Sequence, residues 1–232
     1  MEVEQPQEQQ NKPKILPLPN GPYYLLNDMT PKAVPNLQTS DGKRLSNISG
    51  TALCRCGASK NKPFCDGTHG TIGFLSDNKV IQENGQISKD KKKSYTGKNI
   101  IIHDNRRICS HSGKCVNNLS SVFRLDVKPW IDPNGATAEE IMRTIRKCPS
   151  GALSYSIEGA EHEDQKERDP MITVSKNGPY LITGGVDLIG DNIQWADRSS
   201  KEHYTLCRCG ASNNKPFCDG MHKSINFMDD TK

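Results

Sequence analysis

The sequence predicts an α+β fold in which two small β-rich units flank a different α+β module. Three observations predict it. A sixteen-residue segment occurs twice, at 54–69 and 207–222, and fourteen of its positions match. Each copy follows a short run of Tyr, Leu and Ile that suits a strand. Between the copies, an amphipathic helix lies between two short apolar runs.

The composition limits how much apolar burial can contribute to stability. Only 33% of the 232 residues are hydrophobic and the mean hydropathy is −0.72, whereas globular chains are about 45–50% apolar by a count that includes glycine. The 31 Lys and Arg nearly balance the 27 Asp and Glu, which argues against a dedicated nucleic-acid protein. No apolar run approaches the ~18 residues of a membrane span. We therefore expect a soluble protein that metal sites help to fold.

The two β-rich units have the same internal order. NGPYYLL at 20–26 precedes the first copy of the segment, and NGPYLIT at 177–183 precedes the second. Asn-Gly-Pro is a turn signature, and the residues after it suit a strand. Each repeat is thus a unit of about 50 residues.

The middle of the chain has a different pattern. The run at 98–103 predicts a strand, and 152–157 predicts a returning strand. Between them Thr137 and Glu140 form a capping box, followed by Ile141, Met142 and Ile145 on one helical face.

These patterns divide the chain into five segments. We expect a disordered tail at 1–14, a first unit at 15–78, a middle module at 79–157, a linker at 158–169 and a second unit at 170–232. Residues 82–86 predict a hairpin turn within the middle module.

The nine cysteines indicate metal or redox chemistry. An odd number without an export signal disfavours a disulfide framework, and so we place the protein in the cytoplasm. The thiols fall into three groups of three, and the first and third groups have identical spacing. They are Cys54, Cys56 and Cys65; Cys109, Cys115 and Cys148; and Cys207, Cys209 and Cys218.

Each repeat supplies four soft ligands, because His69 and His222 follow the third thiol of their group by four residues. That spacing places Cys65 and His69 on one face if a helix begins there, while the CxC pair lies apart in the loop. The ligands are then split two and two, which suits a two-iron cluster. Three Cys and one His are also an accepted zinc set, so the donor count leaves both metals open.

The pattern CxC, two residues, Ser, three residues, Pro, x, CDG, x, His resembles the CDGSH iron-sulfur (mitoNEET-like) family. The resemblance covers roughly 15–78 and 170–232, with Thr68 and Met221 in place of the Ser before the His. It implies a [2Fe-2S] cluster in each unit, and zinc fits the CxC spacing less well. The eight implied ligands are Cys54, Cys56, Cys65, His69, Cys207, Cys209, Cys218 and His222. Because the family pairs two such units, it also implies an intramolecular pseudo-dimer and a monomeric chain.

Two further pairs of residues lie inside the motifs. Asp66 and Asp219 are expected to cap the helices that follow. Arg55 and Arg208, between the CxC thiols, either offset the negative cluster or are solvated.

The middle cysteines resemble a divergent mono-cluster [4Fe-4S] ferredoxin domain over about 93–157. Ser112 stands where the ferredoxin pattern has another thiol, and Cys148 precedes a proline. The resemblance implies a ferredoxin-like module that holds a [3Fe-4S] cluster, or a [4Fe-4S] cluster completed by His111, Ser112 or an exogenous ligand. The alternative is that Cys109 and Cys148 are small buried apolar residues in a module without a cluster.

Functionally, the sequence predicts a non-enzymatic single-electron carrier with two [2Fe-2S] clusters and a third [3Fe-4S] or [4Fe-4S] cluster. The alternative is cluster storage and transfer, or redox sensing, because a histidine ligand in an exposed loop is a weak point. The expected partner is a redox protein or an apo iron-sulfur acceptor, with no nucleic acid and no membrane. The sequence shows no nucleophile-base pair, phosphate loop or dinucleotide fingerprint.

Overall fold

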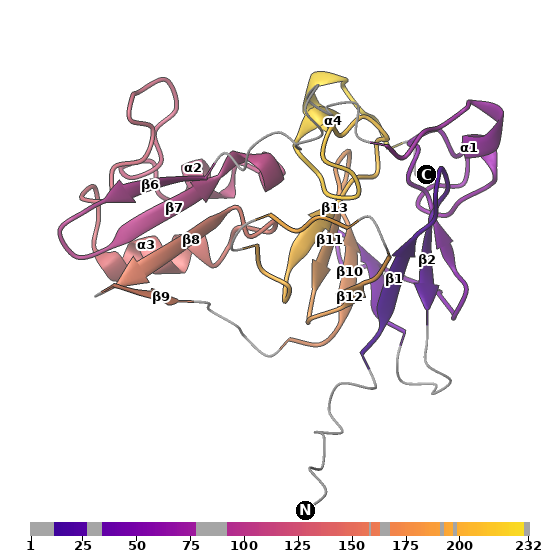
Figure 1. The fold of residues 1–232 in the computed structure, drawn as a ribbon, viewed down its shortest axis with the longest axis horizontal. Helices are drawn as coiled ribbons and strands as arrows, with labels where there is room; N and C mark the ends of the chain where they lie inside the picture. Colours follow the sequence, from indigo (N-terminus) through magenta and orange to yellow (C-terminus); the bar gives the residue numbers. More distant parts are fainter. Residues whose placement is uncertain are drawn as a thin grey trace, which may run out of the picture.

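The computed structural model describes residues 12–26, 34–77, 92–157, 159–162, 168–190, 193–196 and 199–229. These residues form a mixed α+β structure of three small sheets with short helices between them (Figure 1). The predicted hairpin at 82–86 lies outside the described residues, as does most of the predicted tail. No helix of the described residues is long and apolar enough to cross a membrane.

The first sheet has the order β12-β1-β2-β5 and mixes strands of both units. Its first-unit strands are β1 (Lys14–Pro17), β2 (Tyr23–Leu26) and β5 (Ala52–Leu53), all paired antiparallel. The second unit contributes β12 (Asp187–Leu188), which pairs parallel with β1. The predicted strand after Asn-Gly-Pro is confirmed as β2, and its alternate residues Tyr23 and Leu25 are buried.

The second sheet, with the order β13-β11-β10-β3-β4, makes the reciprocal exchange. Its second-unit strands are β10 (Met171–Val174), β11 (Tyr180–Thr183) and β13 (Tyr204–Leu206). The first unit adds β3 (Asn36–Thr39), which pairs parallel with β10, and β4 (Arg44–Leu45). Each unit therefore completes the other's sheet, and one apolar core contains residues of both units, among them Leu25, Leu53, Ile172 and Ile182.

The middle module has its own antiparallel sheet and its own core. The sheet consists of β6 (Lys92–Thr96), β7 (Ile101–Asn105), β8 (Leu153–Ile157) and β9 (Ala160–His162). Two helices, α2 (Lys114–Asn118) and α3 (Ala138–Ile145), accompany it. The predicted capping box is confirmed, since Thr137 caps α3 and Glu140 bonds back to it. Ile141 and Ile145 face the core, as the sequence pattern predicted.

Two expectations about chain boundaries differ from the structure. Lys14, assigned to the tail, is the first residue of β1, because the parallel pairing with β12 orders it. Residues 160–162, assigned to the linker, form β9 on the edge of the middle sheet. A charged sequence can supply an edge strand, because ladder hydrogen bonds need only the backbone.

The middle module contacts the second unit. Arg107 Nε donates to Asn214 Oδ1 at 3.0 Å, and Asn214 Nδ2 donates to the carbonyl of Arg107 at 3.2 Å. Ile108 and Ala152 of the middle module also form a small apolar cluster with Ala196. In Figure 1 the middle module lies beside the second unit, and the first unit lies on the opposite side of the second unit.

Candidate metal centres

Each repeated segment folds into the same closed loop between a strand and a one-turn helix. In the first unit Cys54 follows β5, and its N–H donates to the carbonyl of Pro63 at 2.8 Å. The second unit repeats this bond between Cys207 and Pro216 at 2.8 Å. A serine hydroxyl closes each loop in the same way, Ser59 onto Phe64 and Ser212 onto Phe217. The helices that follow are α1 (Thr68–Thr71) and α4 (Met221–Ser224).

The four predicted ligands of each unit come together as two pairs. The sulfurs of Cys54 and Cys56 are 3.8 Å apart, as are those of Cys207 and Cys209. Cys65 Sγ lies 3.3 Å from His69 Nδ1, and Cys218 Sγ lies 3.5 Å from His222 Nδ1. Two ligands on one tetrahedral metal, with bonds of ~2.0–2.3 Å, are about 3.5–3.8 Å apart. Each pair therefore already has the spacing for one metal.

Distances within the pairs are short, and no larger ligand group is formed among the described residues. Within the described ranges, no three His, Cys, Asp or Glu side chains are placed to hold a single metal ion. A structural zinc site needs four ligands around one ion. The donors present, soft thiolates and an imidazole, are ligands that suit iron or zinc, and their arrangement as two pairs would place each pair on one metal of a two-metal group.

The pairing of Cys65 with His69 is produced by a turn, and the expectation that a helix begins at the cysteine is wrong. Helix α1 begins at Thr68, and Gly67 before it has a φ of 86°, a left-handed conformation that favours glycine. Contrary to expectation, Asp66 is not the N-cap of the helix, because Gly67 occupies that position. Asp66 accepts the N–H of Thr68 at 3.0 Å and that of Lys60 at 2.8 Å, so it ties the motif loop to the start of the helix. Asp219 makes the same two bonds in the second unit, to Met221 and Asn213.

The thiols differ in how readily they lose a proton. Within each CxC pair, a thiol–thiol hydrogen bond lowers the pKa of one member, to about 6 for Cys56 and about 7 for Cys207, and raises the pKa of the other. Burial raises the pKa of Cys65 and of Cys218. Because the thiolate is the form that binds metal, metal binding must displace protons from the thiols whose pKa burial raises.

Reciprocal contacts join the two motif loops, and the sequence analysis did not identify them. The Tyr23 hydroxyl is shared between the carbonyls of Cys207 and Pro216, both at 2.9 Å, and the Tyr180 hydroxyl bonds Cys54 and Pro63 in the same way. The two rings meet edge to face, with centroids 6.0 Å apart. The only sequence signal was that a tyrosine follows Asn-Gly-Pro in both units.

Glycines allow the two CxC loops to approach each other closely. A Cβ on Gly57 would lie 2.7 Å from the carbonyl oxygen of Cys209, and one on Gly210 would lie 2.5 Å from that of Cys56. Each loop therefore needs a glycine directly after its CxC pair.

Arg55 and Arg208 are buried, which excludes the alternative that they are solvated. Each guanidinium lies over the tyrosine of its own unit, 5.2 Å from the Tyr23 ring and 5.6 Å from the Tyr180 ring. Arg208 also forms a buried ion pair with Asp229 at 2.6 Å. Ser76 occupies the corresponding position in the first unit, and no carboxylate of the described residues pairs with Arg55.

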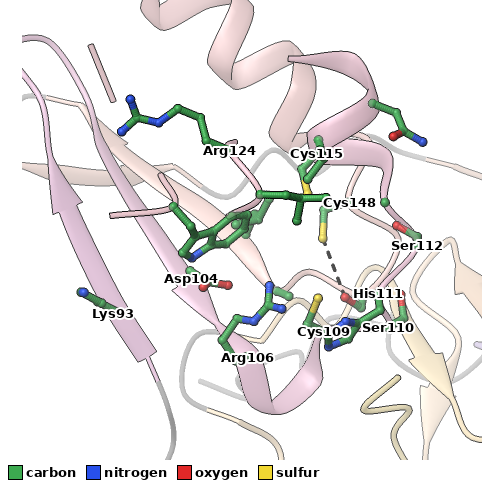
Figure 2. A pocket seen from close by; sticks show the side chains of 18 of the residues that line it. Lys93, Asp104, Arg106, Cys109, Ser110, His111, Ser112, Cys115, Arg124 and Cys148 are labelled. Atoms are coloured by element: carbon green, nitrogen blue, oxygen red, sulfur yellow. Dashed lines mark hydrogen bonds between the residues drawn. The ribbon is translucent and has the colours of Figure 1, made fainter. Parts of the chain in front are cut away.

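The three middle cysteines line a cavity of about 700 Å³. Figure 2 shows their sulfur atoms facing the same space, Cys115 from α2, Cys148 after α3 and Cys109 after the turn at 106–108. Four cationic side chains also line the cavity, namely Lys93, Arg106, Arg124 and Lys223. Burial raises the pKa of Cys109 to about 11. A metal cluster in this space would offset that cost through three thiolate bonds.

The predicted additional ligands, His111 and Ser112, also line this cavity. The Ser112 hydroxyl accepts the N–H of Lys114 at 3.4 Å, and the His111 ring packs against Gly220 of the second unit. Two hydroxyls that the sequence analysis did not single out also line this cavity. Ser150 Oγ lies 3.7 Å from Cys148 Sγ, and Ser110 Oγ is buried with no hydrogen-bond partner. The only signals for them were their sequence positions, since Ser110 follows Cys109 and Ser150 lies two residues after Cys148.

Comparisons with known proteins agree with this division of the chain. A family model described as iron-binding zinc finger CDGSH type matches residues 20–70 and 177–223, and one described as divergent 4Fe-4S mono-cluster matches 95–158. The uncharacterized protein YjdI of Escherichia coli K12 is 44% identical over 61 residues, which are 26% of this chain and 80% of YjdI. YjdI of Escherichia coli O157:H7 gives the same figures. No solved structure matches the chain.

The donor sets and these matches define an iron-sulfur protein. The chain belongs to the CDGSH iron-sulfur family and carries two copies of its motif, with a divergent 4Fe-4S mono-cluster domain between them.

Proposed function

We propose that the chain is a single-electron carrier that holds a [2Fe-2S] cluster in each CDGSH unit and a third cluster, [3Fe-4S] or [4Fe-4S], in the middle module. The observation that carries the proposal is the separation of each donor set into two pairs of 3.3–3.8 Å. Each cluster would supply a reversible one-electron change. Electron transfer of this kind needs no catalytic nucleophile or base.

The polypeptide's own part is to hold, orient and shield these donors. Cys54 and Cys207 are buried. The N–H of Gly67 donates to the Cys65 sulfur, and the N–H of Gly220 donates to the Cys218 sulfur, each at 3.4 Å. Such bonds favour the thiolate without a change of shape, which suits repeated electron transfer. We further propose that the two units form an intramolecular pseudo-dimer and that the chain works as a monomer. The reciprocal strands and tyrosine bonds support this.

The experiment is to count iron and acid-labile sulfide per chain and to record EPR spectra of the oxidised and reduced forms. Four irons would mean that only the CDGSH units are loaded, and seven or eight would add the middle cluster. Repeated reduction and reoxidation without loss of iron would support the carrier. Loss of iron in the first cycle would contradict it.

A second candidate function is cluster transfer from the first unit. Cys65 and His69 are only half-buried, whereas Cys218 is 3% exposed and His222 is 7% exposed. A partner could reach the first donor pair directly. Passage of an intact cluster to an apo-ferredoxin, lost in a Cys65→Ser variant and kept in Cys218→Ser, would favour this function.

A further inference from the structure

The middle module packs directly on the metal-binding loop of the second unit. The His111 ring lies against Gly220, and a Cβ on that glycine would be 2.8 Å from His111 Cγ. Gly220 stands between Cys218 and His222, and its N–H donates to the Cys218 sulfur. On the middle-module side of this contact, His111 follows Cys109 by two residues. One van der Waals contact therefore separates a ligand segment of the middle site from a ligand segment of the second site.

The backbone holds His111 in this position. Its φ of 53° is unusual for a residue other than glycine, and the neighbouring contact of Arg107 with Asn214 keeps the two surfaces together. Strain at such a residue persists only where the surroundings over-determine it.

Among the described residues, the first unit has no such contact. Gly67, which corresponds to Gly220, has open space around its α-carbon and lies at the surface. Its φ of 86° is nearly the same as the 88° of Gly220. The two loops share their conformation and differ in what covers them.

We propose that the middle site and the second CDGSH site form an electron-transfer pair bridged by the contact between His111 and Gly220, from which the first site is separate. The proposal rests on the electron-carrier function proposed above. His111 acts here as a positioning residue that keeps the two ligand segments in contact.

The electron balance is simple. One electron would pass between the group that Cys109, Cys115 and Cys148 would hold and the group that Cys207, Cys209, Cys218 and His222 would hold. No bond forms or breaks, and no proton is required. Its direction is set by the two midpoint potentials, which depend on cluster type, net charge and hydrogen bonds to the sulfurs. An external one-electron reductant supplies the electron.

The test uses the full chain with its clusters, mixed with substoichiometric dithionite and freeze-quenched for EPR. In the parent, the middle and second sites should exchange an electron faster than either exchanges one with the first site. His111→Ala should slow this step about tenfold, because the packed contact that couples the sites is lost. The midpoint potentials should stay unchanged. Hydrogen exchange around residue 214 reports whether the module remains docked.

Matched variants isolate the contact. Gly220→Ala and Gly67→Ala introduce the same side chain at the same backbone conformation, but only the first meets His111. Gly220→Ala should slow the step and Gly67→Ala should not. His111→Phe keeps an aromatic ring on Gly220 and should restore the rate that His111→Ala loses.

Three results would overturn the proposal. These are unchanged rates in both His111→Ala and Gly220→Ala, reduction of the first site as fast as the second in the parent, and loss of middle-site iron in His111→Phe, which would make His111 a ligand. If all sites are reversibly reduced and yet exchange no electrons, this pairing fails while the carrier function stands. If no site is reversibly reduced, the carrier function itself fails.

Discussion

The two CDGSH units have nearly the same motif and occupy different surroundings. Fourteen of sixteen motif residues match, and the donor distances agree within 0.2 Å. Yet the second loop is covered by the middle module and its arginine is paired with Asp229, while the first loop is exposed and Arg55 has no carboxylate partner among the described residues. Local sequence can therefore make two equivalent donor sets, and their neighbours make them chemically different.

Removal of the metals should have the largest effect and should affect the two units unequally. A chelator should extract iron from the first unit faster, by roughly tenfold, because its donor pair is reached without undocking the middle module. Complete removal should abolish the cooperative melt, since metal-binding free energy is also folding free energy. The time course of iron loss in Cys65→Ser and Cys218→Ser variants shows which unit loses iron in the faster phase and which in the slower one. Equal rates of iron loss would contradict the difference in exposure between the two units. A metal-free chain that melts like the parent would contradict the contribution of the metals to folding.

Asp229→Ser should have the next largest effect. It leaves the fully buried guanidinium of Arg208 without its ion pair, which costs about 3–5 kcal/mol for a buried pair. Thermal or denaturant unfolding of the loaded protein measures this. The control is Asp77→Ser in the first unit, which removes an exposed carboxylate next to Ser76. A similar loss in both variants would show that the ion pair is not what distinguishes the units.

The cross-unit tyrosines should instead respond alike. Tyr23→Phe and Tyr180→Phe each remove a donor from two buried carbonyls of the opposite loop, at a cost of about 1–3 kcal/mol. Unfolding experiments on both single variants should give equal losses. If one variant left the free energy of unfolding unchanged, the two tyrosines would not contribute equally to the contact between the units.

The smallest expected effect is on the potential of the first site. Ser76→Asp places a carboxylate where Asp229 stands in the second unit, and added negative charge disfavours reduction. The first potential should fall by on the order of tens of millivolts and approach that of the second site. A redox titration monitored by EPR measures this, with Ser76→Asn as the uncharged control. An equal shift in both variants would rule out a charge effect.

The sequence predicted the local elements well. The strands after Asn-Gly-Pro, the capping box at Thr137 and the apolar face of α3 are confirmed, because each depends on residues within a few positions of one another. The helix expected at Cys65 was wrong, since Gly67 delays it to Thr68. The edge strand at 160–162 was missed because its pairing comes from β8 and not from its own composition.

By itself, the sequence determined the class of the protein and which residues gather at each CDGSH site. Three thiols and a histidine within sixteen residues need only a short loop to come close together. The motif can therefore be recognised from the local sequence, without the rest of the chain. The tertiary structure alone decided that β3 and β12 are exchanged between the units, that Arg208 is neutralised while Arg55 is not, and that His111 reaches Gly220. These contacts join residues far apart in sequence, and their free energies depend on burial and docking. Two nearly identical motifs thus acquire different surroundings from the parts of the chain that pack against them.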